Sequence, residues 1–366
     1  MSAKRKKFSP ILAVITAIFM LGVGLVGGFS AYLHIHEPTD TDVYVSGDLD
    51  IHFLELGNKY TGDCTYINAG GVDILIDAGS KTSSIPHIVS YLDEYVTDKV
   101  LEYVIVTHAH QDHYAGFATS ENTESLFDIY ECEVIIDFSR TNQEDTAKMY
   151  QNYLRERDDE IAKGAQHYTA EDCMTQNLSV FDLGNGMELE ILDSYYYYNK
   201  DSSGENNHSV CCMINQGDNH FLFTGDLEKS GEEKLVELND LPQVVLYKAG
   251  HHGSKTSSHD VLLSEIQPQI VCVCCCAGSP EYTKTNENQF PTQDFIDRIA
   301  PYTEYVYVTT LCTDYENDKF TSMNGNIKVT SNTSGVYVNC SNSDMILKEW
   351  EWFIQNRTCP AAWANE

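Results

Sequence analysis

The chain has 366 residues, of which 42% are apolar and 21% charged, and this globular composition excludes wholesale disorder and collagen-like repeats. Lys and Arg number 23 against 55 Asp and Glu, so the formal net charge is −32. Such acidity argues against a protein that binds long nucleic acid by charge alone. It is compatible with a metal site, because bound cations reverse the local field.

A basic run at residues 4–7 precedes an uncharged, apolar stretch at residues 11–33. As a helix this stretch would span roughly 34 Å, enough to cross a bilayer. A secretory signal would be shorter and end in a better cleavage site, so we expect an uncleaved anchor. The positive-inside rule then keeps the tail of residues 1–10 in the cytosol. Everything beyond a polar linker at residues 34–47 would lie on the extracellular side.

Beyond the linker, the apolar periodicity predicts strands that alternate with helices. The expected strands lie at residues 49–56, 72–76, 101–106, 134–138, 178–181, 187–192, 209–214, 220–223, 244–248, 270–276 and 305–309. The expected helices lie at residues 85–95, 142–161, 227–238, 259–266 and 291–299. This order indicates an α/β fold over residues 48–310, two sheets with helices outside, which is an αββα sandwich. Residues 311–366 predict a β-rich extension that packs on it.

The twelve cysteines show neither the spacing of a compact disulfide framework nor a paired CxxC zinc motif. Four of them crowd one apolar segment, IVCVCCCAG, and two adjacent ones lie in SVCCMI. We therefore expect these six to act as small hydrophobic residues in buried strands, in preference to forming bridges.

Candidate metal ligands concentrate in the segment THAHQDH, which directly follows the expected strand at residues 101–106. Imidazole and carboxylate groups suit zinc, iron or manganese. In an extended segment, His108 and His110 point the same way and can reach one ion. Asp112 and His113 then open a turn and can reach a second ion beside the first.

Two later strand ends carry further candidates. The segment FTGD ends at Asp226, which is placed to bridge two cations, although an aspartate there is also a common helix N-cap. In GHHGSK we expect one of His251 and His252 to bind metal and favour His251, which is nearer the strand. Ser254 and Lys255 follow, and they either contact a substrate anion or make ordinary loop contacts.

Together, HAHQDH, the later strand-end GD and GHHGS resemble the metallo-β-lactamase superfamily. The segments IDAGS, ENNHSV, TGDL and GHHGSKTS are most similar to the hydrolase domain of ComEC-type competence proteins. Related exported hydrolases include cell-wall phosphorylcholine esterases. Over residues 48–310 the resemblance implies an αββα fold of the metallo-β-lactamase type and a dinuclear site. Such sites usually hold two Zn²⁺, with Mn²⁺ or Fe as alternatives.

The resemblance also implies a role for each candidate. Asp77 in IDAGS would orient the histidine loop from behind the ligands. The implied ligands are His108 and His110 for one ion, Asp112 and His113 for the other, Asp226 as the bridge, and His251 or His252 to complete the second site.

Two departures from the superfamily pattern stand out. Many members carry a histidine in a GHTxG loop before the bridging aspartate, where this chain has ENNHS. His208 is the candidate third ligand of the first ion, with Asn207 or an empty position as alternatives and His167 as an outside candidate. In addition, a Tyr/Asn-x-His-Pro segment common in the ComEC-type branch has no histidine here, which puts a substrate contact there in doubt.

The resemblance thus implies a membrane-anchored, exported hydrolase in which a hydroxide shared by two metal ions attacks a phosphoester. Asp112 could also orient the attacking water. Because the chain is strongly acidic, we expect a phosphorylated small molecule or cell-wall polymer as the partner, in preference to nucleic acid. Hydrolysis of β-lactams is a weaker option. The alternative from another class is a non-catalytic, membrane-tethered binding protein that keeps the fold.

Overall fold

The computed structural model describes residues 48–119, 124–144, 146–201 and 204–364. The basic tail, the expected anchor and the linker that follows it lie outside these described residues. Within the described residues, no helix combines the length and apolar character needed to cross a membrane.

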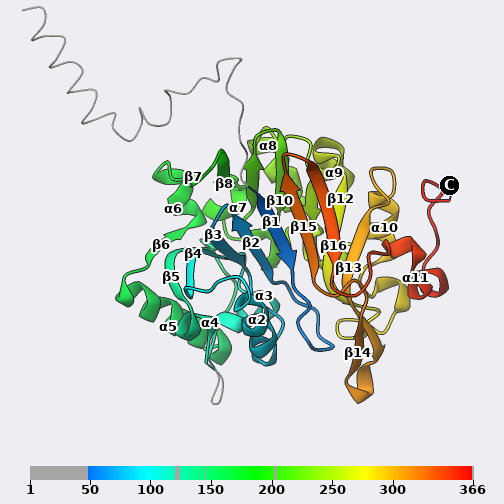
Figure 1. Cartoon of the computed structure of the whole chain (residues 1–366), viewed down its shortest axis with the longest axis horizontal. Helices are drawn as coiled ribbons and strands as arrows, with labels where there is room; N and C mark the ends of the chain where they lie inside the picture. Colours follow the sequence, from blue (N-terminus) through cyan, green and yellow to red (C-terminus); the bar gives the residue numbers. More distant parts are fainter. Residues whose placement is uncertain (1–47, 120–123, 145, 202–203, 365–366) are drawn as a thin grey trace, which may run out of the picture. The chain divides into compact units, whose positions relative to one another are not determined.

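The described part of the chain forms two mixed sheets of eight strands each (Figure 1). The first sheet has the order β16 (Gly335–Cys340), β15 (Ile327–Asn332), β1 (Leu49–Phe53), β2 (Thr65–Ala69), β3 (Val72–Ile76), β4 (Val100–Val106), β5 (Glu131–Asp137) and β6 (Gln166–Thr169). The second has the order β14 (Lys319–Ser322), β13 (Val306–Asp314), β12 (Ile270–Ala277), β11 (Leu246–Lys248), β10 (Asn219–Phe223), β9 (Cys212–Gln216), β8 (Met187–Ile191) and β7 (Val180–Gly184).

Both sheets change from antiparallel to parallel pairing along their length. In the first sheet, β1, β2 and β3 are antiparallel, whereas β3, β4, β5 and β6 are parallel. In the second, β7 to β10 are antiparallel and β10 to β13 are parallel. Parallel neighbours end at the same edge of a sheet, where ligand sites of α/β proteins usually form. We therefore expect a ligand site at the loops that follow β3, β4, β10 and β11.

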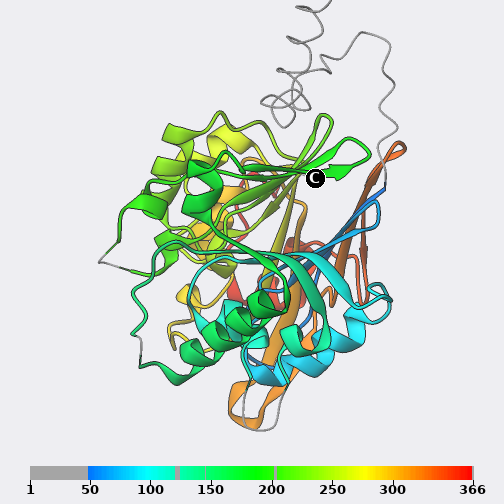
Figure 2. The ribbon, with the colours of Figure 1, turned by 90° about the vertical axis from the view of Figure 1, so that its left-hand side faces the viewer.

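Helices lie on the outer faces of the two sheets, which face each other (Figure 2). Those packed with the first sheet are α2 (Ile85–Leu92), α4 (Leu126–Ile129) and α5 (Lys148–Lys163). Those packed with the second are α8 (Lys229–Leu238), α9 (Asp260–Ile266), α10 (Gln293–Ile299) and α11 (Glu351–Asn356). Three short helices lie in connecting segments, namely α3 (Gln111–Tyr114), α6 (Ala170–Thr175) and α7 (Tyr195–Tyr198). The expected αββα sandwich is confirmed.

Buried apolar side chains fill the space between the sheets. Phe53 of β1 and Phe223 of β10 face each other across it, with ring centroids 6.4 Å apart. The cysteine-rich strand β12 and the pair Cys211–Cys212 are buried, as expected from their apolar neighbours. All twelve cysteines are free thiols. The strands of residues 311–366 belong to the same two sheets. In the first sheet β15 pairs with β1, and in the second β13 continues past residue 310.

The helix expected at residues 142–161 begins later, at Lys148 of α5. Residues before it bond to distant loops instead of forming a helical turn. The Asn142 amide donates to Glu205 Oε2 at 2.5 Å, and Gln143 Nε2 donates to Ala109 O at 2.6 Å. These bonds tie the histidine-rich segment to the loop that precedes β9, a long-range requirement that periodicity alone does not reveal.

Candidate metal centre

The histidine-rich segment leaves the end of β4 and turns into α3. Asp77, which follows β3, holds its start: Asp77 accepts hydrogen bonds from the Thr107 amide at 2.8 Å and from Thr107 Oγ1 at 2.7 Å. Gly79 allows the close approach of the two loops, because a Cβ there would meet Asp112 O at 1.5 Å. The IDAGS segment therefore fixes the position of the histidine turn.

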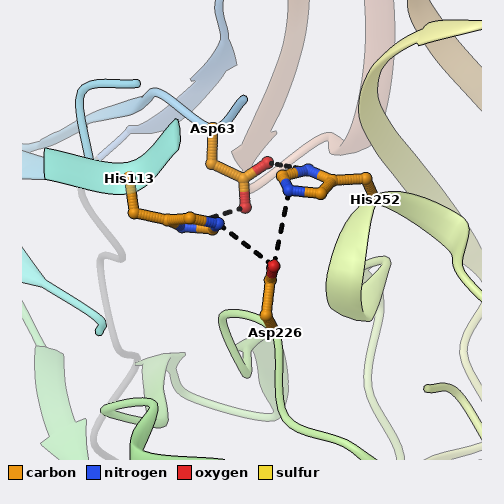
Figure 3. Close-up of side chains that lie close together, drawn as sticks. All are labelled: Asp63, His113, Asp226 and His252. Atoms are coloured by element: carbon orange, nitrogen blue, oxygen red, sulfur yellow. Dashed lines mark hydrogen bonds and ion pairs between the residues drawn. The ribbon is translucent and has the colours of Figure 1, made fainter. Parts of the chain in front are cut away.

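The first group of candidate ligands joins both sheets (Figure 3). It consists of Asp63, His113, Asp226 and His252, all buried, with one ligand atom from each within 4.8 Å of the others. Asp226 Oδ2 lies 3.2 Å from His113 Nε2 and 3.4 Å from His252 Nε2. The loops after β4, β10 and β11 thus converge, as the strand-end positions of these residues predicted.

A second group shares Asp226 with the first. It contains His108, His110 and Asp226, again with ligand atoms within 4.8 Å of one another. His108 Nε2 lies 3.0 Å from His110 Nδ1 and 3.9 Å from Asp226 Oδ2. Asp226 is itself held by its amide, which donates to Ser209 Oγ at 3.1 Å. One carboxylate between two histidine groups is the arrangement expected of a dinuclear site.

Two buried carboxylates orient the imidazoles from behind. His113 Nδ1 lies 2.7 Å from Asp77 Oδ2, and His252 Nδ1 lies 3.0 Å from Asp63 Oδ1. Each contact leaves the Nε2 atom directed toward Asp226. Carboxylate partners of this kind fix the tautomer and increase the basicity of metal-binding histidines.

Asp63 is the residue that sequence analysis missed. One of its oxygens contacts His252 and the other is paired with Lys248, which is buried at the end of β11. Burial alone would raise the pKa of Asp63, but Lys248 and His252 outweigh it and lower that pKa. Although Asp63 lies within ligand distance of the group, both of its oxygens already have partners, so we assign it to the orientation of His252. A lysine at the end of a buried strand was the available signal, because a buried ammonium group requires an acid.

Asp112 joins the centre beside His252. Its Oδ2 lies 3.4 Å from His252 Nε2 and 2.7 Å from the hydroxyl of Tyr282. Burial would raise the pKa of Asp112, yet the contact with His252 and the nearby His113 hold that pKa well below its usual range. The carboxylate is therefore anionic, which suits either metal binding or the orientation of a water molecule.

Both residues of the His-His pair approach Asp226. They lie in the 3₁₀ turn η4 (Gly250–Gly253) with left-handed φ angles of 48° for His251 and 55° for His252. His252 belongs to the first ligand group, whereas His251 is partly exposed and has its Nε2 3.8 Å from Asp226 Oδ2. The sequence analysis favoured His251 as the ligand, but it is His252 that lies in the ligand group and contacts the orienting carboxylate of Asp63.

The residues of the centre fit divalent metal ions. Three buried polar atoms there lack a hydrogen-bond partner among the described residues, namely His113 Nε2, His252 Nε2 and Asp226 Oδ1. Such atoms cost about 1–3 kcal/mol each when unpaired, a cost that a coordinated cation removes. Burial lowers the pKa of His113 and His252, but Asp226 and further carboxylates raise both pKa values well above the usual range. A cation would replace the protons that these imidazoles otherwise hold.

Comparison with known proteins agrees with this geometry. Residues 57–154 match the family model described as the Metallo-beta-lactamase superfamily. That match includes β4 and the histidine-rich segment that follows it, so this part of the chain is similar to the metallo-β-lactamase superfamily. The two groups that share Asp226 are the candidate metal residues found in the described part of the chain.

The relatives include "Competence protein ComA" of Neisseria gonorrhoeae, which is 31% identical over 121 residues that cover 32% of this chain and 16% of the relative. "Recombination protein 2" of Haemophilus influenzae is 25% identical over 245 residues, which cover 66% of this chain and 25% of the relative. "ComE operon protein 3" of Bacillus subtilis is 24% identical over 179 residues, which cover 48% of this chain and 20% of the relative. The chain thus spans about a quarter or less of the length of these relatives. The solved metallo-β-lactamase fold protein YhfI from Bacillus subtilis aligns with a TM-score of 0.41 and 11% identity over 75% of this chain and 100% of that one.

The candidate third ligand of the first ion, His208, is in neither ligand group, although its Nε2 is a buried atom without a hydrogen-bond partner among the described residues. His208 ends the 3₁₀ turn η3 (Asn206–His208) and is buried, with its Nδ1 3.4 Å from Tyr196 O. Asn207 is also engaged elsewhere, because its Nδ2 donates to Asp201 Oδ2 at 2.7 Å. His167 pairs with Asp137 Oδ1 at 2.9 Å. None of the three belongs to the ligand groups found among the described residues.

The residues that follow the His-His pair turn toward neighbouring loops. Ser254 is buried, and its Oγ lies 3.1 Å from Thr256 Oγ1. Lys255 is exposed, and its Nζ donates to Asn288 Oδ1 at 3.1 Å. Both make the ordinary loop contacts that were one of the two expectations for them, and a substrate contact remains a prediction.

Proposed function

We propose that this chain is a metal-dependent phosphoester hydrolase, anchored in a membrane with its hydrolase domain on the extracellular side. The observation that carries the proposal is the convergence of two histidine groups on the single carboxylate of Asp226. Two divalent cations bound there would supply a nucleophilic water near neutral pH and polarise a substrate oxygen. Zn²⁺ is our proposal for both, with Mn²⁺ or Fe as alternatives.

The protein residues would do three things in this reaction. His108 and His110 on one side of Asp226, and His113 and His252 on the other, hold the ions. Asp63 and Asp77, behind them, keep the imidazoles in the required tautomer. Asp112, with its Oδ2 facing the same space, accepts a hydrogen bond from the attacking water and so directs its lone pair toward phosphorus.

The proposed substrate class rests on charge and on the resemblance to exported hydrolases. A chain with net charge −32 repels a long polyanion unless local cations offset it. We therefore propose a phosphorylated small molecule or a phosphorylated cell-wall polymer, rather than a long nucleic acid. The location rests on the uncharged stretch at residues 11–33 and the basic run before it.

The function is tested by metal analysis and phosphodiesterase assay on the full chain in detergent. We expect about two divalent ions per chain and metal-dependent hydrolysis of bis-p-nitrophenyl phosphate. His110→Ala should reduce both. His87→Ala is the matched control, because His87 is an exposed histidine on α2, outside the centre, and should leave both unchanged.

Each other outcome has a distinct meaning. Bound metal without turnover of any phosphoester would favour the non-catalytic, membrane-tethered binding protein. Absence of bound metal from protein purified with Zn²⁺ would overturn the proposal that the chain is a metal-dependent enzyme. The location is tested separately: protein that leaves the membrane fraction on alkaline extraction would contradict the anchor.

A further inference from the structure

The loop between β12 and α10 carries Tyr282, which contacts a residue of the candidate metal centre. The Tyr282 hydroxyl donates to Asp112 Oδ2 at 2.7 Å, although the side chain as a whole is 56% exposed. It is therefore a solvent-facing residue whose polar tip reaches the candidate ligands. Its partner, Asp112, lies 170 positions earlier in the chain.

A stack of rings connects Tyr282 to the histidine pair. The Tyr282 ring lies 5.6 Å from that of Phe290, and Phe290 lies 5.8 Å from the rings of both His251 and His252. Of Tyr282 and Phe290, only Tyr282 has a side-chain hydrogen-bond donor.

The loop is fixed at both ends by hydrogen bonds. Glu281, next to Tyr282, accepts the Thr61 amide at 2.9 Å through its Oε2. Arg357, from the C-terminal extension, donates to Gln289 O at 2.7 Å and to Pro291 O at 3.0 Å. The hydroxyl is therefore pre-positioned, which lowers the cost of using it in a transition state.

We propose that Tyr282 is a substrate-contacting catalytic residue whose hydroxyl donates a hydrogen bond to the leaving-group oxygen. This inference rests on the proposed phosphoester hydrolysis. The hydroxyl has one hydrogen and rotates about the C–O bond, so it can pass from Asp112 to a substrate oxygen while the ring stays in place.

The step is balanced without any further reactant. The oxygen of one water molecule bonds to phosphorus, and that water releases a proton to solvent. The bond from phosphorus to the leaving oxygen breaks, and its electron pair stays on that oxygen, which Tyr282 stabilises while keeping its own proton. The leaving oxygen then takes a proton from solvent.

The test compares Tyr282→Phe with wild type, both as metal-loaded full chains, on two esters of methyl phosphate. Stabilisation of the leaving oxygen matters more as that oxygen becomes more basic. We expect kcat for methyl phenyl phosphate to fall by about 10- to 100-fold, and kcat for methyl p-nitrophenyl phosphate by only a few fold. Metal content should equal that of wild type.

Tyr337→Phe is the matched control. Tyr337 is an exposed tyrosine on β16, and its hydroxyl donates to Ser334 O at 2.8 Å. Tyr337→Phe should leave kcat unchanged for both esters. An equal loss on both esters, a loss of metal, or no loss in Tyr282→Phe would overturn the inference while leaving the hydrolase proposal intact. A wild type that hydrolyses neither ester would overturn both.

Discussion

His52 and His113 are both completely buried, yet their surroundings are opposite. The His52 ring lies among three tyrosine rings, with centroids 5.1 Å from Tyr66, 5.7 Å from Tyr91 and 4.8 Å from Tyr95. His113 instead lies between the carboxylates of Asp77 and Asp226.

The two environments move the imidazole pKa in opposite directions. Burial lowers the pKa of His52 to about 4, with a smaller contribution from Lys328. At His113 burial also lowers the pKa, but Asp226 and Asp77 outweigh it and raise that pKa well above its usual range. Burial alone therefore makes a neutral core histidine, whereas burial among carboxylates makes a site that attracts a cation.

The largest effect should follow from removing the shared carboxylate. Asp226→Asn leaves the imidazoles in place but takes away the charge that both ligand groups use. We expect bound metal to fall below one ion per chain and turnover of bis-p-nitrophenyl phosphate to fall by roughly 1,000-fold or more. Retention of two ions in this variant would show that the groups do not depend on Asp226.

His52, which lies among tyrosine rings, should affect the stability of the folded protein at acid pH and not its metal content. His52 titrates at the ordinary 6.5 in the unfolded chain and at about 4 in the folded protein. The folded state therefore binds fewer protons between these values, and the free energy of unfolding should fall by about 3 kcal/mol as the pH drops from 6.5 to 4.

His52→Phe should reduce this fall in metal-free protein, measured by urea denaturation at pH 7 and pH 4.5. The pKa of His108 is also lowered by burial, so His108 keeps a contribution of the same sign in both proteins. His87→Phe, on the surface of α2, is the control and should show the same fall as wild type. His113 and His252 have raised pKa values, so their contribution in metal-free protein has the opposite sign. It is present below pH 6.5 and is lost as the pH rises through their folded pKa values. A His52→Phe variant as acid-labile as wild type would contradict the comparison.

A smaller effect is expected where a carboxylate orients a ligand without being shared. Asp63→Asn should weaken metal affinity by about 10- to 100-fold, because the hydrogen bond to His252 Nδ1 loses its charge. Since this variant also leaves Lys248 without its acid, the double variant Asp63→Asn/Lys248→Met restores charge balance and separates misfolding from loss of orientation. Wild-type affinity in the double variant would rule out the orienting role.

The smallest effect is expected at His208. This histidine lies outside both ligand groups, so His208→Gln should leave the metal content unchanged and turnover within a few fold of wild type. Loss of one ion in this variant would restore His208 as the third ligand and would mean that the loop after α7 moves when metal binds.

The sequence predicted those parts of the centre that lie in short motifs at strand ends. His108, His110, Asp112 and His113 lie within six residues, and Asp226 follows its strand directly. These positions are set by local geometry, because a strand end fixes where the next few side chains can point. The layered fold followed from the order of apolar segments for the same reason.

The contacts that were missed join segments far apart in the chain. Asp63 meets Lys248 across 185 positions and His252 across 189, and Tyr282 meets Asp112 across 170. No periodicity or spacing encodes such a meeting, which depends on how two sheets pack. The preference for His251 over His252 was set by distance from the strand, whereas in the left-handed turn at Gly250–Gly253 it is His252 that joins the first ligand group.

The central claim is that Asp226 lies between two metal ions. Anomalous diffraction from crystals of the Zn²⁺-loaded protein, recorded on both sides of the zinc edge, tests it most directly. We predict two peaks, one bonded to His108, His110 and Asp226 and the other to His113, His252 and Asp226. No peak, or peaks away from Asp226, would contradict the account.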